Sequence, residues 1–274
     1  MYAAPYADIT TEDLKAFAAK NFVANNISLV ATGVSESELK SLVDSAFSDV
    51  AAGSAAKVET AKYYGGDVRV GAHTDAGHVA VAFQGAAAGT PDFYTAQVLR
   101  SLLGGDRFVK WSTAGVSPLA AAAGKIGHGA QISAFNFGYS DAGLFGVYAQ
   151  ASHKDVTEAA KTAVGALKAA AKSISAEEFQ RALAQAKFEA ASRYETRVAS
   201  TEVLAEQALQ GHKVSVSESL AALDKVQAGD VSKVKKKKAN FAIDAVFIHE
   251  RERKMIALRL FFADFFPCCH LSFE

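Results

Sequence analysis

The stretch Ile132 to Gln150, ISAFNFGYSDAGLFGVYAQ, constrains the fold more than any other part of the chain. Aromatic residues alternate with small or polar ones from Phe135 to Tyr139, and bulky residues alternate again from Leu144 to Tyr148. This period of two is that of a β-strand, whose successive side chains point to opposite faces of a sheet. The stretch therefore predicts two strands joined as a hairpin.

The SDAG tetrapeptide between the strands raises the question of whether Ser140 and Asp141 are catalytic. An early Asp and a late Gly143 are typical of a short turn that uses a left-handed glycine. A nucleophilic serine needs a neighbouring base, and no His lies nearby in the sequence. The local prediction is a hairpin turn.

Composition and charge exclude several classes of protein. The chain has 274 residues, of which 50% are hydrophobic, and a formal net charge of zero, which indicates a globular protein with a real core. Without a basic excess, no nucleic-acid partner is predicted. Adjacent Cys268 and Cys269 predict no stabilising disulfide. The chain lacks a run of about 18 apolar residues, so no spanning helix is predicted, and the N-terminus has no basic or Arg-rich targeting segment.

Residues 10–50 are predicted to form a helix, a strand and a second helix. Thr10 or Thr11 can cap the first helix, NISLVATG (26–33) has the pattern of a short buried strand, and Ser35 and Glu38 have the spacing of a capping box. This unit cannot bury its own apolar faces. The apolar positions of the two helices are Leu14, Phe17, Ala18, Phe22, Leu39, Leu42, Val43, Ala46 and Phe47.

A second body is predicted after the small, polar and unpatterned residues 50–66, which fit a linker. Strands are expected at 67–73 and 78–86, and a helix from Pro91 to the glycines at 104 and 105. Residues 106–128, rich in Gly and Ala, are expected to form a loop. Three further helices are predicted, at 154–173, 175–195 and 200–212, the second with a capping box at Ser175 and Glu178. Strands followed by helices predict an α+β fold, with helices packed on a mixed, largely antiparallel sheet.

Two segments that contain cysteine or histidine come near the pattern of a metal site. HERER (His249 to Arg253) nearly fits the templates H-E-x-x-H and H-x-x-E-H, but Arg253 stands where each needs a second His. A cation cannot ligate zinc, and CCH at 268–270 lacks further ligands at a suitable spacing. No metal ligand and no catalytic residue is therefore assigned.

Other polar features favour structural roles. The glycines of GKIGHG (124–129) lack the strand–turn–helix context of a phosphate cradle and are expected in a flexible loop. The run Lys235 to Lys238 is more typical of a solvated helix end than of a basic targeting signal or a phosphate-binding site. His73, His78 and His128 lie in or beside expected strands or loops, which favours ordinary structural partners.

Two stretches carry a family resemblance. HVAVAFQGAAAGTPDFYTAQVLRSLLGG (78–105), followed by ISAFNFGYSDAGLFGVYA (132–149), resembles the pitrilysin-type metallopeptidase superfamily. The pattern SAFN..YSD.GLFG is the specific part. It is similar to the core protein 2 family of mitochondrial ubiquinol–cytochrome c reductase, respiratory complex III, rather than to the mitochondrial processing peptidases. The resemblance covers about residues 5–234.

The resemblance implies two similar α+β domains joined by a linker. It places the C-terminal remnant of a first peptidase-like domain at 1–50, the linker at 51–66 and the second peptidase-like domain at 67–238, so that the chain looks truncated. Residues 239–274 diverge from the family and hold seven of the 18 phenylalanines and both cysteines. We expect this tail, of doubtful order, to come from read-through or aberrant splicing. NFAIDAVF (240–247) nevertheless has the pattern of a final strand.

Function follows from the same resemblance. Active relatives hold zinc on an inverted H-x-x-E-H motif in the first domain. That motif is absent from this sequence, and the core protein 2 family is regarded as non-catalytic. The resemblance thus implies a structural subunit without a cofactor, partnered by the other core subunit and the remaining subunits of complex III. It implies a place on the matrix side of the mitochondrial inner membrane, associated with the membrane only through the complex.

Three hypotheses about function remain open from the sequence. In the structural one, folding or interface roles fall to Phe135, Phe137, Leu144, Phe145 and Tyr148. In the second, the chain is a non-catalytic subunit or fragment of a processing peptidase that binds presequence peptides, with strand edges near 78–85 and 132–149 pairing with the peptide. In the third, the chain is a fragment without a stable function.

Overall fold

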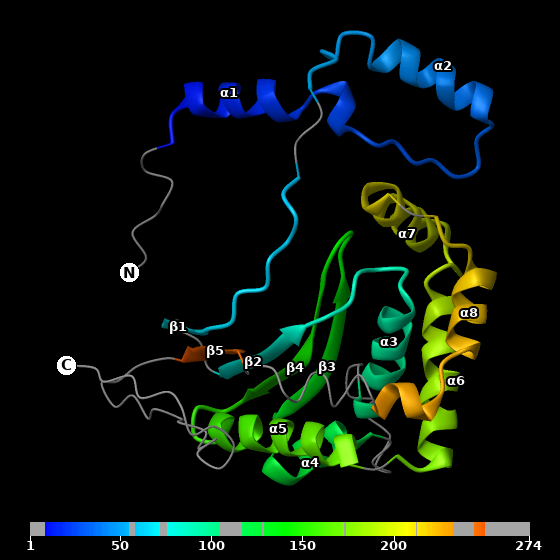
Figure 1. The fold of residues 1–274 in the computed structure, drawn as a ribbon. Helices are drawn as coiled ribbons and strands as arrows, with labels where there is room; N and C mark the ends of the chain where they lie inside the picture. Colours follow the sequence, from blue (N-terminus) through cyan, green and yellow to red (C-terminus); the bar gives the residue numbers. More distant parts are fainter. Residues whose placement is uncertain are drawn as a thin grey trace.

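The computed structural model describes residues 9–54, 58–71, 76–104, 117–127, 129–172, 174–211, 213–232 and 244–249. Within these ranges, a small helical unit at the N-terminal end is joined by an extended segment to a larger body of sheet and helices (Figure 1). None of the helices in the described ranges is long and apolar enough to cross a bilayer.

The body is built on a five-stranded sheet in the order β1-β5-β2-β4-β3. β1 and β5 are parallel, and every other neighbouring pair is antiparallel, with Val81 opposite Val147 and Ala134 opposite Val147 on its other side. The predicted mixed, largely antiparallel sheet is confirmed. The strands are β1 (Asp67–Gly71), β2 (Gly77–Gln84), β3 (Gln131–Gly138), β4 (Gly143–Ala151) and β5 (Asp244–His249).

Helices cover one face of this sheet in two layers (Figure 1). The layer next to the strands consists of α3 (Pro91–Leu103), α4 (Pro118–Ile126) and α5 (Val156–Lys172). Behind it, α6 (Ala176–Ser192) and α8 (Val216–Asp224) pack on α3, and α7 (Arg197–Gln210) follows α6. The α+β fold with helices packed on the sheet is therefore confirmed.

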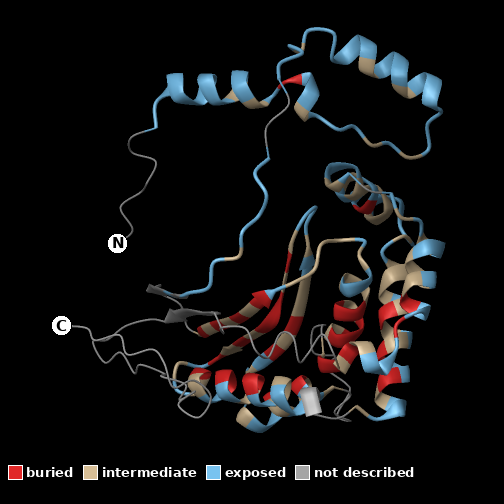
Figure 2. Ribbon diagram, in the orientation of Figure 1, coloured by how far each residue is buried: buried red, intermediate tan, exposed pale blue. Residues whose placement is uncertain are grey.

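The core lies between the sheet and the helices that cover it (Figure 2). Every second residue of β2 and β4 is buried there, as the period of two requires. The helices supply Leu99, Leu103 and Leu119, each with no more than 1% of its surface exposed. Phe179 and Ala186 of α6 are also buried, on the helix face predicted from the sequence.

Capping residues fix where most helices begin. Ser175 and Glu178 form the predicted capping box of α6, and the hydroxyl of Thr90 accepts from the Phe93 amide ahead of Pro91, the first residue of α3. At the other end of α3, Gly104 ends the helix with φ of +115°, as predicted. Gly211 likewise ends α7 in the left-handed conformation.

The N-terminal unit has α1 (Thr11–Asn21), a short 3-10 helix η1 (Ala24–Asn26) and α2 (Glu36–Ala46). Thr10 caps α1, and Ser35 and Glu38 form the predicted capping box of α2. The buried strand expected at 26–33 is wrong: residues 27–31 have no regular structure, and Ile27 and Leu29 are 40% and 48% exposed. A strand needs a neighbouring strand for its backbone groups, and this segment pairs with none of the strands that the structure describes.

Several segments outside the expected strands and helices have regular structure, including α8 at residues 216–224. The loop expected at 106–128 is wrong for residues 118–126, which form α4. Ser117 caps it, and Pro118 stands at its first position, followed by four alanines that favour helix. Residues 106–116 and 128 lie outside the described ranges. The strand pattern noted at 240–247 is present in part, because Asp244–His249 forms β5 between β1 and β2.

Candidate functional site

The sheet face opposite the helices is the most distinctive surface of the described chain. Its residues come from alternate positions of β2, β3 and β4 and, apart from the buried Gly146, are half-buried or exposed, whereas most of those in between are buried against the helices. We call this surface the outer face. Its members are His78, Ala80, Ala82, Gln84, Gln131, Ser133, Phe135, Phe137, Leu144, Gly146, Tyr148 and Gln150.

The residues assigned from the sequence to folding or interface roles divide between the two faces. Phe145 is 1% exposed and belongs to the core. Phe135 and Phe137 lie on the outer face with their rings stacked at a centroid distance of 5.2 Å, and Phe137 is 54% exposed. Aromatic residues are enriched at protein–protein contacts relative to the rest of a protein surface.

His78 and Tyr148 form a polar pair on the outer face. His78 Nδ1 and the Tyr148 hydroxyl lie 2.5 Å apart, which confirms an ordinary structural partner for His78. Burial raises the pKa of the Tyr148 phenol above its ordinary value, so the hydroxyl stays protonated at neutral pH. It can therefore donate to His78 when the imidazole is neutral with its proton on Nε2.

The SDAG segment forms the predicted hairpin turn, closed by a bond from the Tyr139 amide to the Ala142 carbonyl at 2.8 Å. The left-handed glycine expected there is wrong, because Gly143 is not among the residues with positive φ. Its lack of a side chain serves close packing instead: a Cβ at Gly143 would lie 2.2 Å from the Ala86 carbonyl oxygen. Ser140 and Asp141 are both exposed at the tip of the hairpin.

Behind the hairpin lies a network of polar side chains that was not predicted from the sequence. The Asn136 amide nitrogen donates to the Phe93 carbonyl and to Gln97 in α3, at 3.4 and 3.3 Å. The Glu189 carboxylate of α6 accepts from Gln97 and from Arg100, the latter at 2.6 Å with both side chains 17% exposed. This network joins β3, α3 and α6. Only an Asn at a core-facing position of a strand signalled it in the sequence.

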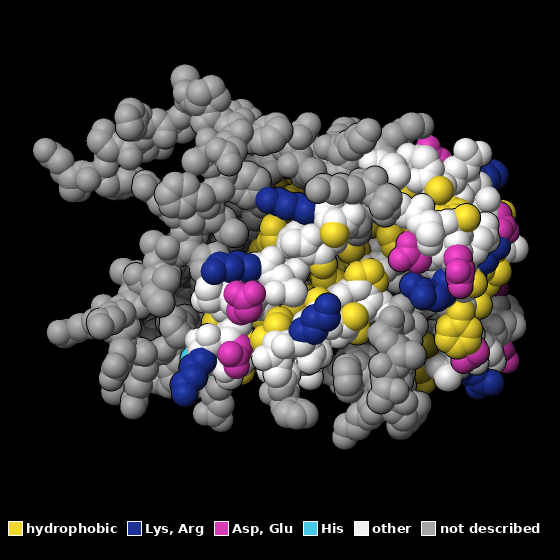
Figure 3. Space-filling view, turned by 90° about the horizontal axis from the view of Figure 1, so that it is seen from below, with side chains coloured by type: hydrophobic (Ala, Val, Ile, Leu, Met, Phe, Trp, Pro, Cys, Tyr) yellow, Lys and Arg dark blue, Asp and Glu magenta, His cyan; other side chains and the backbone are white. Residues whose placement is uncertain are grey.

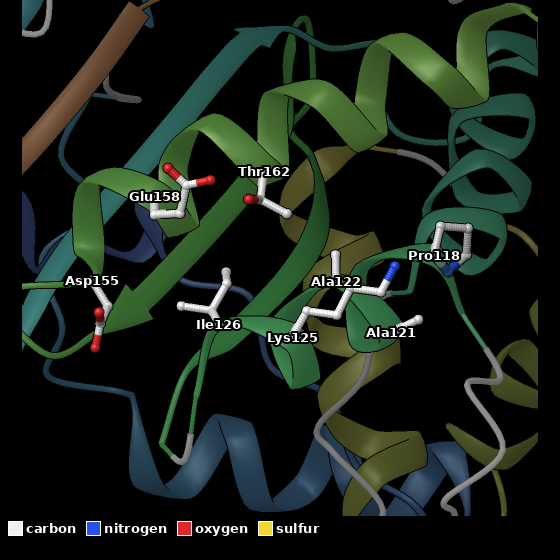
Figure 4. Close-up of a pocket in the computed structure, with 8 residues that line it drawn as sticks. All are labelled: Pro118, Ala121, Ala122, Lys125, Ile126, Asp155, Glu158 and Thr162. Atoms are coloured by element: carbon white, nitrogen blue, oxygen red, sulfur yellow. The ribbon is translucent and has the colours of Figure 1, made fainter.

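Two cavities open between helices. One of about 430 Å³ lies between α4 and α5 and is lined by Ile126 and by the charged side chains of Lys125, Asp155 and Glu158, among others (Figure 4). The other, of about 540 Å³, lies between the start of α3 and α8. The side of the molecule seen in Figure 3 carries apolar side chains interspersed with both signs of charge. Across the described ranges, no three His, Cys, Asp or Glu side chains are grouped to hold a metal ion.

Several sequence candidates fall elsewhere. Gly124 lies inside α4, so the flexible loop expected at 124–129 is wrong for its first residues, whereas Gly127 and Gly129 have positive φ beyond the helix end. His249 ends β5. Outside the described residues lie His73, His128, Lys235 to Lys238, residues 250–253 and CCH at 268–270.

The strand edges proposed for peptide binding are wrong for β2 and β4. β2 lies between β5 and β4, and β4 lies between β2 and β3, so both edges of each strand are already paired. β3 is at the border of the sheet, where its Ala134 amide donates to the Gly104 carbonyl at 2.7 Å. Strand addition needs a free row of backbone groups, which β2 and β4 do not offer.

Comparison with known proteins gives a consistent result. A family model described as the Peptidase M16 inactive domain matches residues 8–186. The mitochondrial cytochrome b-c1 complex subunit 2 of Cryptococcus neoformans is 39% identical over 72% of this chain and 45% of its own length. The corresponding subunit of Yarrowia lipolytica is 33% identical over 77% of this chain and 49% of its own length. Subunits of mitochondrial-processing peptidase match at 29% identity.

A solved structure has the same fold. A chain of complex III2 from Candida albicans, bound to Inz-5, superposes with a TM-score of 0.73 at 22% identity, over 88% of this chain and 59% of its own. The chain spans about half the length of the curated relatives it matches.

Proposed function

The chain belongs to the inactive-domain family of the M16 peptidases, and on that premise we propose that it is a non-catalytic core subunit of mitochondrial respiratory complex III. What carries the proposal is the match at 39% identity, over 72% of this chain, to a protein named cytochrome b-c1 complex subunit 2. Processing-peptidase subunits match at lower identity, 29%. The description of the family as inactive supports a role without catalysis.

The proposed work of the chain is to bury apolar surface against its partners. These are the other core subunit and the remaining subunits of complex III, on the matrix side of the mitochondrial inner membrane. The outer face suits this role, because Phe135, Phe137 and Leu144 form an apolar surface with the exposed Tyr139 beside it. Burying such a surface stabilises an interface by about 25 cal/mol per Å² of apolar area.

We also propose the domain division that the family resemblance implies. Residues 1–50 are then the end of a first peptidase-like domain, 51–66 the linker, and 67–238 the second domain. In support, Leu14 and Phe17 of α1 and Phe22 at its C-cap are 60–67% exposed, as on a helix whose natural neighbour is another part of a larger domain. The extended, exposed residues 58–62 suit a linker.

Co-purification tests the proposed function. A tag on the chromosomal gene, followed by mild solubilisation of mitochondria, is expected to recover the chain with cytochrome b and other complex III subunits on a native gel. Migration of the tagged chain without those subunits would contradict the proposal. Recovery with processing-peptidase subunits and a bound presequence would support the alternative instead.

Phe137→Asp tests the role of the outer face within the same experiment. A charge placed among the apolar side chains opposes burial against a partner, so we expect recovery of complex III subunits to fall about tenfold. Phe188→Asp on α6 is the matched control, because Phe188 is 67% exposed and lies away from the sheet. Equal recovery with both variants would exclude the outer face as the contact surface.

A further inference from the structure

The tip of the β3–β4 hairpin is a meeting point of segments that are far apart in the sequence. The Ala88 amide, between β2 and α3, donates to the Tyr139 carbonyl at 2.9 Å. From α7, the Gln210 side chain donates to the Gly138 carbonyl at 3.2 Å. The body of the protein therefore holds this turn in place from two sides. A side chain at the tip has a fixed position from which to bind a more loosely held segment.

Asp141 uses that position to bind the extended segment 58–66. The Ala61 amide donates to Asp141 Oδ2 at 2.7 Å, across 80 residues of sequence. A hydrogen bond from an amide to a carboxylate is stronger than one between neutral groups. Two residues further on, the Tyr63 hydroxyl lies 3.5 Å from the Ala82 carbonyl of β2. The segment thus contacts the sheet body at two successive points.

A separate contact joins the N-terminal unit to α7. The hydroxyls of Thr32 and Thr201 lie 3.0 Å apart, and a Cβ added at Gly33 would lie 3.8 Å from Arg197 of α7. The α7 helix therefore touches the N-terminal unit and, through Gln210, also the hairpin tip. Two contacts that are distant in sequence therefore reach the body: Ala61 of the extended segment bonds to Asp141, and Thr32 of the N-terminal unit bonds to Thr201.

We propose that Asp141 is a positioning residue that anchors the segment 58–66 to the hairpin tip and so fixes where the N-terminal unit lies over the sheet body. A segment of exposed, irregular backbone loses conformational freedom when it is held at one point. The anchor at Ala61 shortens the free length between the sheet and the unit. The two parts of the chain are then presented to a partner in one arrangement.

Hydrogen exchange of the Ala61 amide, measured by NMR on the full chain, tests the proposal. In Asp141→Ala the amide loses its acceptor, and we expect its exchange to speed up about 3- to 10-fold, the equivalent of one net hydrogen bond. Asp141→Asn keeps a side-chain oxygen and is expected to restore most of the protection. Ser140→Ala is the matched control in the same turn, because no hydrogen bond of its side chain to another described residue is recorded.

Trypsin cleavage after Lys62 provides a second readout, because this side chain is exposed one residue beyond the anchored amide. We expect Asp141→Ala to be cut faster there and Ser140→Ala to be cut at the wild-type rate. Unchanged exchange at Ala61 together with unchanged cleavage at Lys62 overturns the proposal. Faster exchange throughout β2 and β4 in Asp141→Ala also overturns it, since Asp141 would then support the hairpin itself.

Discussion

Gly146 lies where a neighbouring strand and an aromatic ring leave no room for a side chain. A Cβ there would lie 2.2 Å from the Val81 carbonyl oxygen and 2.6 Å from the Phe135 ring. Phe135 is directly opposite Gly146 on β3, so the ring covers the backbone that glycine leaves bare. The aromatic residue and the glycine therefore act together, and each explains why the other occupies its position.

We expect Gly146→Ala to lower the free energy of unfolding by about 1–3 kcal/mol, because the strand backbone of β2 cannot move away as a flexible side chain can. Gly165→Ala is the matched control. Gly165 lies within α5, and a Cβ there meets nothing within 4 Å, so we expect it to stabilise the protein by about 0.5–1 kcal/mol. Urea unfolding of both variants measures the difference. Equal stabilities would show that β2 and β4 are not held this closely.

Four helices of the described chain begin with the same device. In α1, α2, α6 and α8 a Thr or Ser hydroxyl accepts from an amide three residues on, while an acidic side chain at that position binds back. Such a box satisfies amides that have no partner within the helix. It works over four residues of sequence and needs no tertiary contact, which is why it appears on exposed and buried helices alike.

The box of α8 predicts a pH dependence. Bonds from the Ser215 backbone amide and hydroxyl hold the pKa of Glu218 below its ordinary value. The stabilisation is therefore fully present above the ordinary pKa of about 4.3 and is lost as the pH falls through the lowered value. Ser215→Ala removes the hydroxyl bond but keeps the backbone amide bond, so we expect the pKa of Glu218 to rise part of the way towards its ordinary value, measured by NMR titration of the carboxyl carbon. An unchanged titration would contradict the assigned cause.

The whole molecule combines a well-packed body with an N-terminal unit that is mostly exposed. Of the described residues before 55, only Val23 is a buried hydrophobic, and it does not belong to the core cluster. Meanwhile Leu14 and Phe17 of α1, Leu42 of α2 and Phe47 at the C-cap of α2 are exposed to 40% or more. The sheet body is thus stabilised by its own core, whereas the apolar helix faces of the N-terminal unit are suited to burial against another protein surface.

Removal of residues 1–57 is expected to change the free energy of unfolding of the body by less than about 1 kcal/mol, because residues 9–54, the part of this range that the structure describes, add no side chain to the core cluster. The shortened protein should also aggregate less, since it loses exposed apolar helix faces. Thermal unfolding and light scattering measure the two effects. A loss of several kcal/mol would show that the N-terminal unit carries part of the core.

The sequence by itself determined the elements whose signals are local. The alternation around SDAG set the hairpin, and caps at Thr10, Ser35 and Ser175 set where helices begin. The loop predicted for 118–126 was wrong, because its Gly- and Ala-rich composition resembles a loop although Ser117 caps a helix there. Motif likeness also indicated the family, which the match over residues 8–186 bears out. These signals extend over a few residues or a contiguous motif, so they can be read without a neighbour.

Only the tertiary structure decided the relations between distant segments. It placed β5 between β1 and β2, which paired both edges of β2, and it left residues 27–31 without a strand to pair with. It showed that position 143 needs glycine because a Cβ would clash with Ala86, and not because of a positive φ. It also gave Asp141 a hydrogen-bond partner 80 residues away. Strand pairing and close backbone approach depend on which segments meet in the fold. The sequence around a hydrogen-bond acceptor such as Asp141 does not show which distant residue will donate to it. That information exists only once the chain has folded.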